Sequence, residues 1–180
     1  MLRRWAPADL PDLVAAGADP VVWRFRYSIP RDRHEAVKWL SRLEPDRRAG
    51  ARLELAIAVA DTPEAAVGSI SLTEIQHRTA MVRYWLAPEA RGRGLATRGV
   101  GLLAAWAFHW LGMARLGLHI EPENVASQRV ADRCGFVQEG RLRSHGETRD
   151  GQRVDVLIYG LLPGELDAFA FKTSPPREAT

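Results

Sequence analysis

A loop rich in glycine and arginine, set between a strand-like run and a long helix, constrains this chain more than any other feature. The apolar run Met81–Leu86 ends shortly before residues 91–94, which read Arg-Gly-Arg-Gly, and apolar side chains then recur at helical spacing over 95–111. Such a loop presents successive backbone N–H groups at a helix N-terminus, where the helix dipole also favours negative charge. Gly92 and Gly94 carry no Cβ atom to hold an anion away from the backbone. The pattern predicts a strand–loop–helix unit that binds an anion.

Two arginines in this loop indicate which anion fits. Arg91 and Arg93 can add charge-assisted hydrogen bonds to phosphate oxygens, so the loop is shaped for a pyrophosphate. An ordinary tight turn before a helix would also explain a single Gly-x-Gly.

Two familiar phosphate motifs do not match. A P-loop needs a lysine after its second glycine, but Lys38 and Lys172 are the only lysines and neither follows a glycine. The Rossmann fingerprint needs a third glycine where Thr97 stands, and an acidic residue about twenty positions on, which the region near residue 112 lacks.

Further motifs follow in a fixed order, and together they resemble one family. Residues 91–96 match Arg-x-x-Gly-x-Gly/Ala, residues 123–127 read Glu-Asn-Val-Ala-Ser, and residues 134–136 read Cys-Gly-Phe. This order and spacing resembles the GNAT acetyltransferase superfamily. The Rim-type branch, which holds ribosomal-protein N-terminal acetyltransferases and small-molecule relatives, is closest. The residues that fit this branch are Leu2, Arg3, Tyr84, Trp85, Leu86, Asp155 and Tyr159.

The resemblance implies one α/β domain, with a mixed α+β sheet, over residues 1–171 and a flexible tail over 172–180. Its order is an antiparallel meander, then strand–helix–strand–helix, then a C-terminal β-hairpin. The strands on either side of the long helix would run parallel and splay apart, so that their unpaired backbone groups accept the pantetheine arm of acetyl-CoA. Periodicity alone supports only a mixed α/β domain with one central sheet.

The periodicity places most elements. Asp32 and Glu35 have capping-box spacing ahead of a helix that carries an apolar stripe to Leu43. The aromatic segment 23–27 fits either a strand face or a loop that closes over a pocket. Asp150-Gly151 is a hairpin signal. The remaining helices are predicted at 8–16, 95–111 and 124–134, and the strands at 2–5, 53–60, 67–75, 81–86, 115–120, 136–143 and 154–161.

Composition limits the partners. Arginine far outnumbers lysine, and this bias indicates genome composition rather than nucleic-acid binding, because the arginines are scattered and the net charge is only +3. No apolar run approaches the ~20 residues needed to span a membrane, and no secretory signal is present, so we expect a cytoplasmic protein. The single cysteine, Cys134, excludes an internal disulfide and is expected to be a small core residue. A homodimer is among the assemblies we consider.

The resemblance also implies the chemistry, which is transfer of an acetyl group from acetyl-CoA to a primary amine by direct attack in a ternary complex. The acceptor would be a protein or peptide N-terminus or a small-molecule amine. It would enter between segment 23–27 and the final hairpin. A catalytically silent acyl-CoA-binding regulatory domain is the alternative. The cofactor-binding residues would be Trp85, Leu86, Arg91, Gly92, Arg93, Gly94, Leu95, Ala96, Thr97, Asn124 and Ser127.

The sequence constrains the catalytic residues less than it constrains the cofactor-binding residues. Many GNAT enzymes use a tyrosine as general acid at the position of Ala131, and in Rim-type relatives a serine at the position of Ser127 is the proposed substitute. Asn124 and Ser127 also suit helix capping. Glu74 is the candidate base, acting through a water, and His145 and Glu147 lie near another glutamate position of the branch. No histidine pair has metal-ligand spacing, so no metal is expected.

Overall fold

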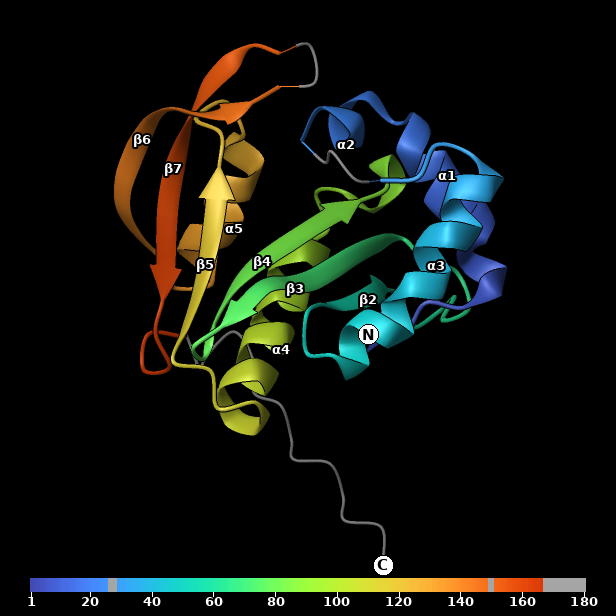
Figure 1. The fold of residues 1–180 in the computed structure, drawn as a ribbon, viewed down its shortest axis with the longest axis horizontal. Coiled ribbons are helices and arrows are strands. Elements are labelled where there is room, and N and C mark those ends of the chain that lie inside the picture. The colour runs from blue at the N-terminus through green and yellow to red at the C-terminus, as the bar shows by residue number, and fades with distance from the viewer. Residues whose placement is uncertain (26–28, 149–150, 167–180) are drawn as a thin grey trace, which may run out of the picture.

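The computed structural model describes residues 1–25, 29–148 and 151–166. In these residues a seven-stranded sheet runs in the order β1-β2-β3-β4-β5-β7-β6, with helices on both faces (Figure 1). The strands are β1 (Leu2–Arg3), β2 (Leu53–Ile57), β3 (Gly68–Gln76), β4 (Thr79–Leu86), β5 (Arg115–Ile120), β6 (Val137–Glu147) and β7 (Arg153–Leu161). The helices are α1 (Leu10–Ala18), α2 (Pro20–Phe25), α3 (Arg33–Arg48), α4 (Leu95–Trp110) and α5 (Val125–Arg133), with 3-10 turns η1 (Pro7–Asp9) and η2 (Pro88–Ala90). The predicted mixed α/β class and element order are confirmed.

One strand pair differs from the others. Every neighbouring pair is antiparallel except β4 and β5, which run parallel and pair only from Thr79–Met81 to Arg115–Gly117. Beyond these residues β4 continues to Leu86 and β5 to Ile120 without pairing to each other. The two strands therefore diverge at their C-terminal ends, as the resemblance implied (Figure 1).

Two apolar clusters hold the helices to the sheet. Side chains alternate between the two faces of a strand, so Val82 joins the cluster under α4 and α5 while Trp85 joins the cluster under α1, α2 and α3. Val100 and Leu103 of α4 are almost fully buried in the first cluster. The second cluster has an aromatic centre, where Trp85 lies 6.2 Å from Trp5 between ring centroids. The sheet is thus fixed on both sides of the diverging strands.

Local signals place the helix ends. The Asp32 carboxylate accepts a hydrogen bond from the Glu35 N–H at 2.8 Å, which confirms the predicted start of α3. The Glu35 side chain reaches back to the N–H of Arg31 at 2.9 Å, one residue before the cap. Gly112 and Gly135 follow α4 and α5 with φ of +62° and +85°, a conformation that favours glycine and ends each helix.

The prediction for segment 23–27 was wrong as far as the structure describes that segment. Residues 20–25 form α2 rather than a strand or a loop, because Pro20 takes the first helical position and the Asp19 carboxylate accepts the Val22 N–H at 2.8 Å. Tyr27, the Asp150 half of the hairpin signal and the tail 172–180 lie outside the described residues. Strand β6 is longer than predicted, because a register shift between Leu142 and Gly146 lets pairing continue to Glu147.

Candidate active site

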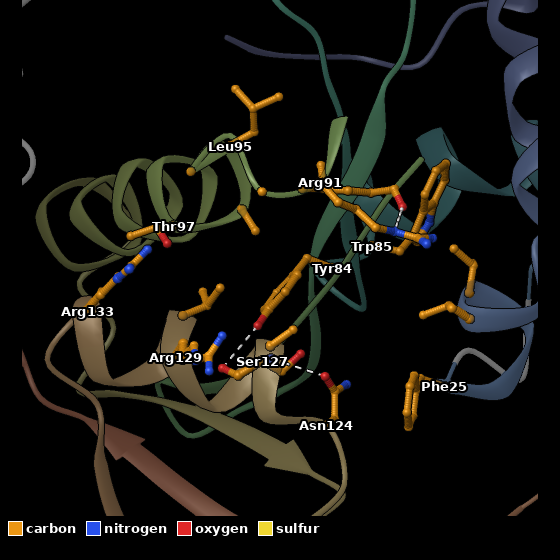
Figure 2. A pocket seen from close by; sticks show the side chains of 18 residues that line it. Phe25, Tyr84, Trp85, Arg91, Leu95, Thr97, Asn124, Ser127, Arg129 and Arg133 are labelled. Carbon is orange, nitrogen blue, oxygen red and sulfur yellow. Dashed lines mark hydrogen bonds between the residues drawn. The ribbon is translucent and has the colours of Figure 1, made fainter. Parts of the chain in front are cut away.

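A cavity of about 420 Å³ opens where β4 and β5 diverge (Figure 2). One wall is the loop after β4 with the first turn of α4, and the opposite walls come from α5 and α2. Its lining combines the glycine loop, the α5 N-terminus and aromatic side chains from β4 and α2. These residues are Val21, Val22, Phe25, Tyr84, Trp85, Leu86, Arg91, Gly92, Gly94, Leu95, Ala96, Thr97, Asn124, Ala126, Ser127, Arg129, Val130 and Arg133.

The glycine loop forms an open cradle. Gly92 and Gly94 have φ of +72° and +73°, and a Cβ atom built on either would meet no atom within 4 Å. Gly94 is the N-cap residue of α4, so the unpaired N–H groups of the first helical turn lie beside this open space. Such a cradle at a helix N-terminus fits a phosphate-bearing group such as the pyrophosphate of acetyl-CoA.

The arginines of the site divide into two kinds. The Arg91 guanidinium donates to the Leu86 carbonyl at 3.1 Å and to Asp19 Oδ1 at 2.7 Å, so it fastens the loop to β4 and to the start of α2. Burial would raise the pKa of Asp19, but its hydrogen bonds from Arg91 and the Val22 N–H outweigh burial and lower that pKa. Arg129 and Arg133 of α5 instead line the cavity with exposed side chains. Sequence reasoning missed both, although their four-residue spacing puts them on one helix face.

Asn124, Ser127 and Tyr84 meet where α5 begins. Asn124 Oδ1 accepts the Ser127 N–H at 3.1 Å, which confirms that Asn124 caps the helix. The Tyr84 hydroxyl, reaching from β4, donates to the Ser127 carbonyl at 3.5 Å (Figure 2). Burial raises the pKa of Tyr84 to about 12, so its hydroxyl keeps its proton at neutral pH. Sequence reasoning did not assign Tyr84 a role, although strand alternation places it on the α5 side of β4.

The candidate base lies apart from this group. Glu74 has a positive φ of 53° at an irregularity of β3, and its exposed carboxylate pairs with Arg83 at 2.6 Å. It is not among the residues that line the cavity. His119 stacks edge to face on His145 at 5.8 Å, and burial lowers the pKa of His119. The role of Glu74 as a base stays a prediction, and Glu147, which pairs with Arg153 at 3.1 Å, offers no stronger geometry.

The remaining predicted residues lie in the cavity wall, on the surface and in the core. Leu86, Leu95, Ala96 and Thr97 line the cavity, whereas Arg93 is exposed and does not. The Tyr159 hydroxyl donates to Gln138 Oε1 at 3.1 Å, which confirms it as a buried tyrosine with a satisfied hydroxyl.

Among the described residues, no group of three or more His, Cys, Asp or Glu side chains has the geometry to hold a metal ion. In the described part of the chain, no helix has the length and apolar character that a membrane crossing requires.

We expect Cys134 to resist alkylation in the folded protein. The residue is fully buried, its Sγ lies 3.5 Å from the Thr97 carbonyl, and burial raises the pKa of its thiol to about 12. At pH 8 about one thiol in ten thousand would be ionised, and the thiolate is the reactive form. Iodoacetamide labelling followed by intact-mass spectrometry should add nothing to the native chain and one group to the denatured chain. Rapid labelling of the native chain would contradict this burial.

The fold and this cavity define an α/β domain that can hold a phosphate-bearing co-substrate between two diverging parallel strands. The family described as "Acetyltransferase (GNAT) domain" matches residues 1–137. The chain belongs to the GNAT acetyltransferase family, which confirms the resemblance drawn from its motifs.

Known relatives agree with this assignment. The chain is 34% identical over 100 residues to the putative ribosomal N-acetyltransferase YdaF of Bacillus subtilis, covering 54% of each protein. It is 30% identical over 110 residues to spermidine N(1)-acetyltransferase of Vibrio cholerae, covering 58% of this chain and 64% of that protein. These alignments leave more than a third of each relative's length unmatched.

Solved structures extend the likeness over most of the chain. RimJ of Mycobacterium smegmatis, in complex with CoA-disulfide, superposes with a TM-score of 0.79 at 25% identity, over 92% of this chain and 83% of RimJ. Spermidine N-acetyltransferase of Vibrio cholerae, in complex with CoA and spermine, has the same fold, with a TM-score of 0.77 at 22% identity over 92% of this chain and 96% of that one.

Proposed function

We propose that this chain transfers an acetyl group from acetyl-CoA to a primary amine. The observation that carries the proposal is the open glycine cradle at the N-terminus of α4, set at the point where β4 and β5 diverge. Family membership supports it, as do relatives named for N-acetylation and structures titled as CoA complexes. The domain that carries this activity is proposed to span residues 1–171.

Each part of the site has a task in this proposal. Gly92, Gly94 and the first turn of α4 would hold the pyrophosphate, and the exposed Arg129 and Arg133 would add positive charge. Unpaired backbone of Trp85 and Leu86 would hold the pantetheine arm, and an N–H of this strand would stabilise the oxyanion. Bound acetyl-CoA supplies a thioester whose carbonyl carbon forms the new C–N bond as the C–S bond breaks.

Two protons must move in this reaction. The attacking nitrogen loses one proton, and the departing sulfur gains one. Ser127 lies in the cavity on the first turn of α5 and is the proposed donor to the sulfur. Glu74, acting through a water, remains the proposed base.

Replacing Ser127 with alanine tests the donor. We expect kcat to fall roughly ten- to a hundredfold while the affinity for acetyl-CoA stays within about threefold, because the hydroxyl would act only after binding. Steady-state kinetics and calorimetry measure the two quantities. Tyr84→Phe is the comparison, since it removes only the neighbouring hydroxyl, and a large loss in that variant with none in Ser127→Ala would move the role to Tyr84. Loss of thermal stability and cofactor affinity in Ser127→Ala would mark the serine as a structural cap.

The proposed acceptors are a small amine or a protein N-terminus, by analogy with relatives named for spermidine and for ribosomal proteins. Release of CoA thiol, followed with a disulfide dye, tests spermidine, butylamine and a seven-residue peptide with a free N-terminus. Intersecting double-reciprocal plots would support direct attack in a ternary complex, whereas parallel plots would contradict it. Binding of acetyl-CoA with no thiol release for any amine would indicate the silent regulatory domain instead.

The proposal also covers the cellular location and the oligomeric state of the protein. A cytoplasmic protein and a homodimer remain predictions, which cell fractionation and light scattering would measure. Binding to nucleic acid is not expected, and a salt-dependent DNA shift assay would test this.

A further inference from the structure

Glu121 has a partly buried carboxylate, and one of its two oxygens is fully buried without a hydrogen-bond partner among the described residues. It follows directly after β5, and its side chain is only 12% exposed. Among the described residues, Oε2 of this carboxylate is buried and has no hydrogen-bond partner. The facing cation is Arg24 of α2, whose Nη2 lies 3.9 Å from Oε2, beyond hydrogen-bond distance.

This carboxylate lies next to residues that line the cavity, although Glu121 is not itself one of them. The Glu121 carbonyl accepts the N–H of Asn124 at 2.9 Å, and Asn124 lines the cavity. Arg24 precedes Phe25, which lines the cavity from α2. Figure 2 shows Asn124 and Phe25 at the end of the cavity away from Leu95 and Thr97. Glu121 therefore lies beside the end opposite the phosphate cradle.

An oxygen in this state is unfavourable without a ligand. A buried acceptor that has lost water and gained no donor destabilises the protein, and the cost is larger when the group is charged. Burial raises the pKa of Glu121, Arg24 opposes that rise and Glu123 adds to it. The missing partner is an N–H donor, and a positive charge on that donor would offset the desolvation of the carboxylate.

We propose that Glu121 binds the acceptor, by accepting a hydrogen bond from a positively charged amine group. The inference rests on the proposed acetyl transfer and narrows it to acceptors that reach this end of the cavity as cations, such as polyamines or peptide N-termini. Arg24 competes with the acceptor for the same oxygen. Glu121 is an acceptor-binding residue in this account, distinct from Ser127 and Glu74.

A purely structural role makes a different prediction. If Glu121 only held α2 through Arg24, removing either partner would have the same effect on the protein. If Glu121 binds the acceptor, removing Arg24 should improve acceptor binding, because it removes a competing cation. The two variants therefore separate the two roles by the direction of the change.

The experiment compares Glu121→Gln, Arg24→Gln and a control, Glu123→Gln, which removes the same charge from an exposed neighbour. The probes are spermidine, butylamine and the seven-residue peptide. For the amines that the unaltered chain acetylates, Glu121→Gln should raise the amine KM roughly ten- to a hundredfold, the range for a hydrogen bond to a charged group. Its kcat, melting temperature and affinity for acetyl-CoA should change little. Calorimetric titration of the same amine in the absence of acetyl-CoA should give a matching rise in Kd.

The remaining variants complete the test. Arg24→Gln should lower the amine KM, Glu123→Gln should leave it within about twofold, and Glu121→Asp, which keeps the charge, should lie between the native chain and Glu121→Gln. An unchanged KM in Glu121→Gln, or an equal rise in Arg24→Gln, would overturn the inference while leaving the proposed acetyl transfer intact. If the unaltered chain acetylates none of the three amines, the proposed function fails, and this inference fails with it.

Discussion

Replacing Gly94 with aspartate should weaken acetyl-CoA binding more than a hundredfold in a protein that still folds. Asp is among the residues that best tolerate the left-handed conformation found here, with φ of +73°, and a Cβ atom at this position meets nothing within 4 Å. The added side chain would fill the cradle and place a negative charge against the pyrophosphate. Two unit charges 4 Å apart repel by about 4 kcal/mol at an effective dielectric constant near 20, which exceeds a hundredfold in affinity.

A matched control isolates this effect. Gly50, in the loop between α3 and β2, also has a positive φ, of +67°, and open space around its Cβ position, and it is not among the residues that line the cavity. Gly50→Asp should leave calorimetric affinity for acetyl-CoA unchanged while producing a similar small change in melting temperature. Equal affinity in folded Gly94→Asp and the native chain would mean that acetyl-CoA does not bind at this loop.

Replacing Arg3 with methionine should destabilise the fold by roughly 3–5 kcal/mol, the range for breaking a buried ion pair from one side. The Asp9 side chain is only 1% exposed. Each of its two carboxylate oxygens accepts a hydrogen bond from the Arg3 guanidinium, Oδ1 at 2.6 Å and Oδ2 at 2.7 Å. Methionine keeps the apolar stem but leaves Asp9 with the Ala6 N–H, which lies 2.8 Å from Oδ2. For a chain of this size, we expect the melting temperature to fall by roughly 6–20 °C.

The control for this stability measurement is Arg47→Met. Arg47 pairs with Glu44 at 2.7 Å on the surface of α3, with both side chains about 40% exposed. Exposed pairs contribute about 0–1 kcal/mol, so urea unfolding should place this variant within about 1 kcal/mol of the native chain. Similar losses in both variants would show that the Arg3–Asp9 pair is no more important than a surface pair.

The sequence predicted those parts of the fold that local signals determine. Strand β5 was predicted with the bounds that the structure has, because apolar side chains alternate along it and Gly112 and Pro122 lie close to its two ends. The helix at α2 was missed because its six residues are too few to display a period. What defines α2 is Asp19, whose carboxylate accepts the Val22 N–H and the Arg91 side chain, and the second of these contacts spans 72 residues.

In the candidate site, too, the sequence predicted the features that neighbouring residues determine and missed those that depend on contacts between distant residues. Glycine spacing before α4 predicted the cradle, since backbone geometry there follows from residues next to one another. Tyr84 and Glu121 gained their significance only when the ends of β4 and β5 were brought together with α5 and α2. A carboxylate with an unused buried oxygen has no signature in a sequence, because the burial comes from residues far away along the chain.

Asp19 couples ligand binding at one end of the cavity to ligand binding at the other. The Asp19 carboxylate caps α2, which lines the proposed acceptor end, and also accepts a hydrogen bond from Arg91 of the proposed phosphate-binding loop. A phosphate bound at the loop would restrain Arg91 and therefore Asp19, and Asp19 would in turn restrain α2. Binding of one ligand would thus favour binding of the other. Linkage is reciprocal, so any gain in amine affinity caused by acetyl-CoA must equal the gain in acetyl-CoA affinity caused by the amine. Cooperativity between the two substrates, and a preferred order of binding, would then follow from a single side chain.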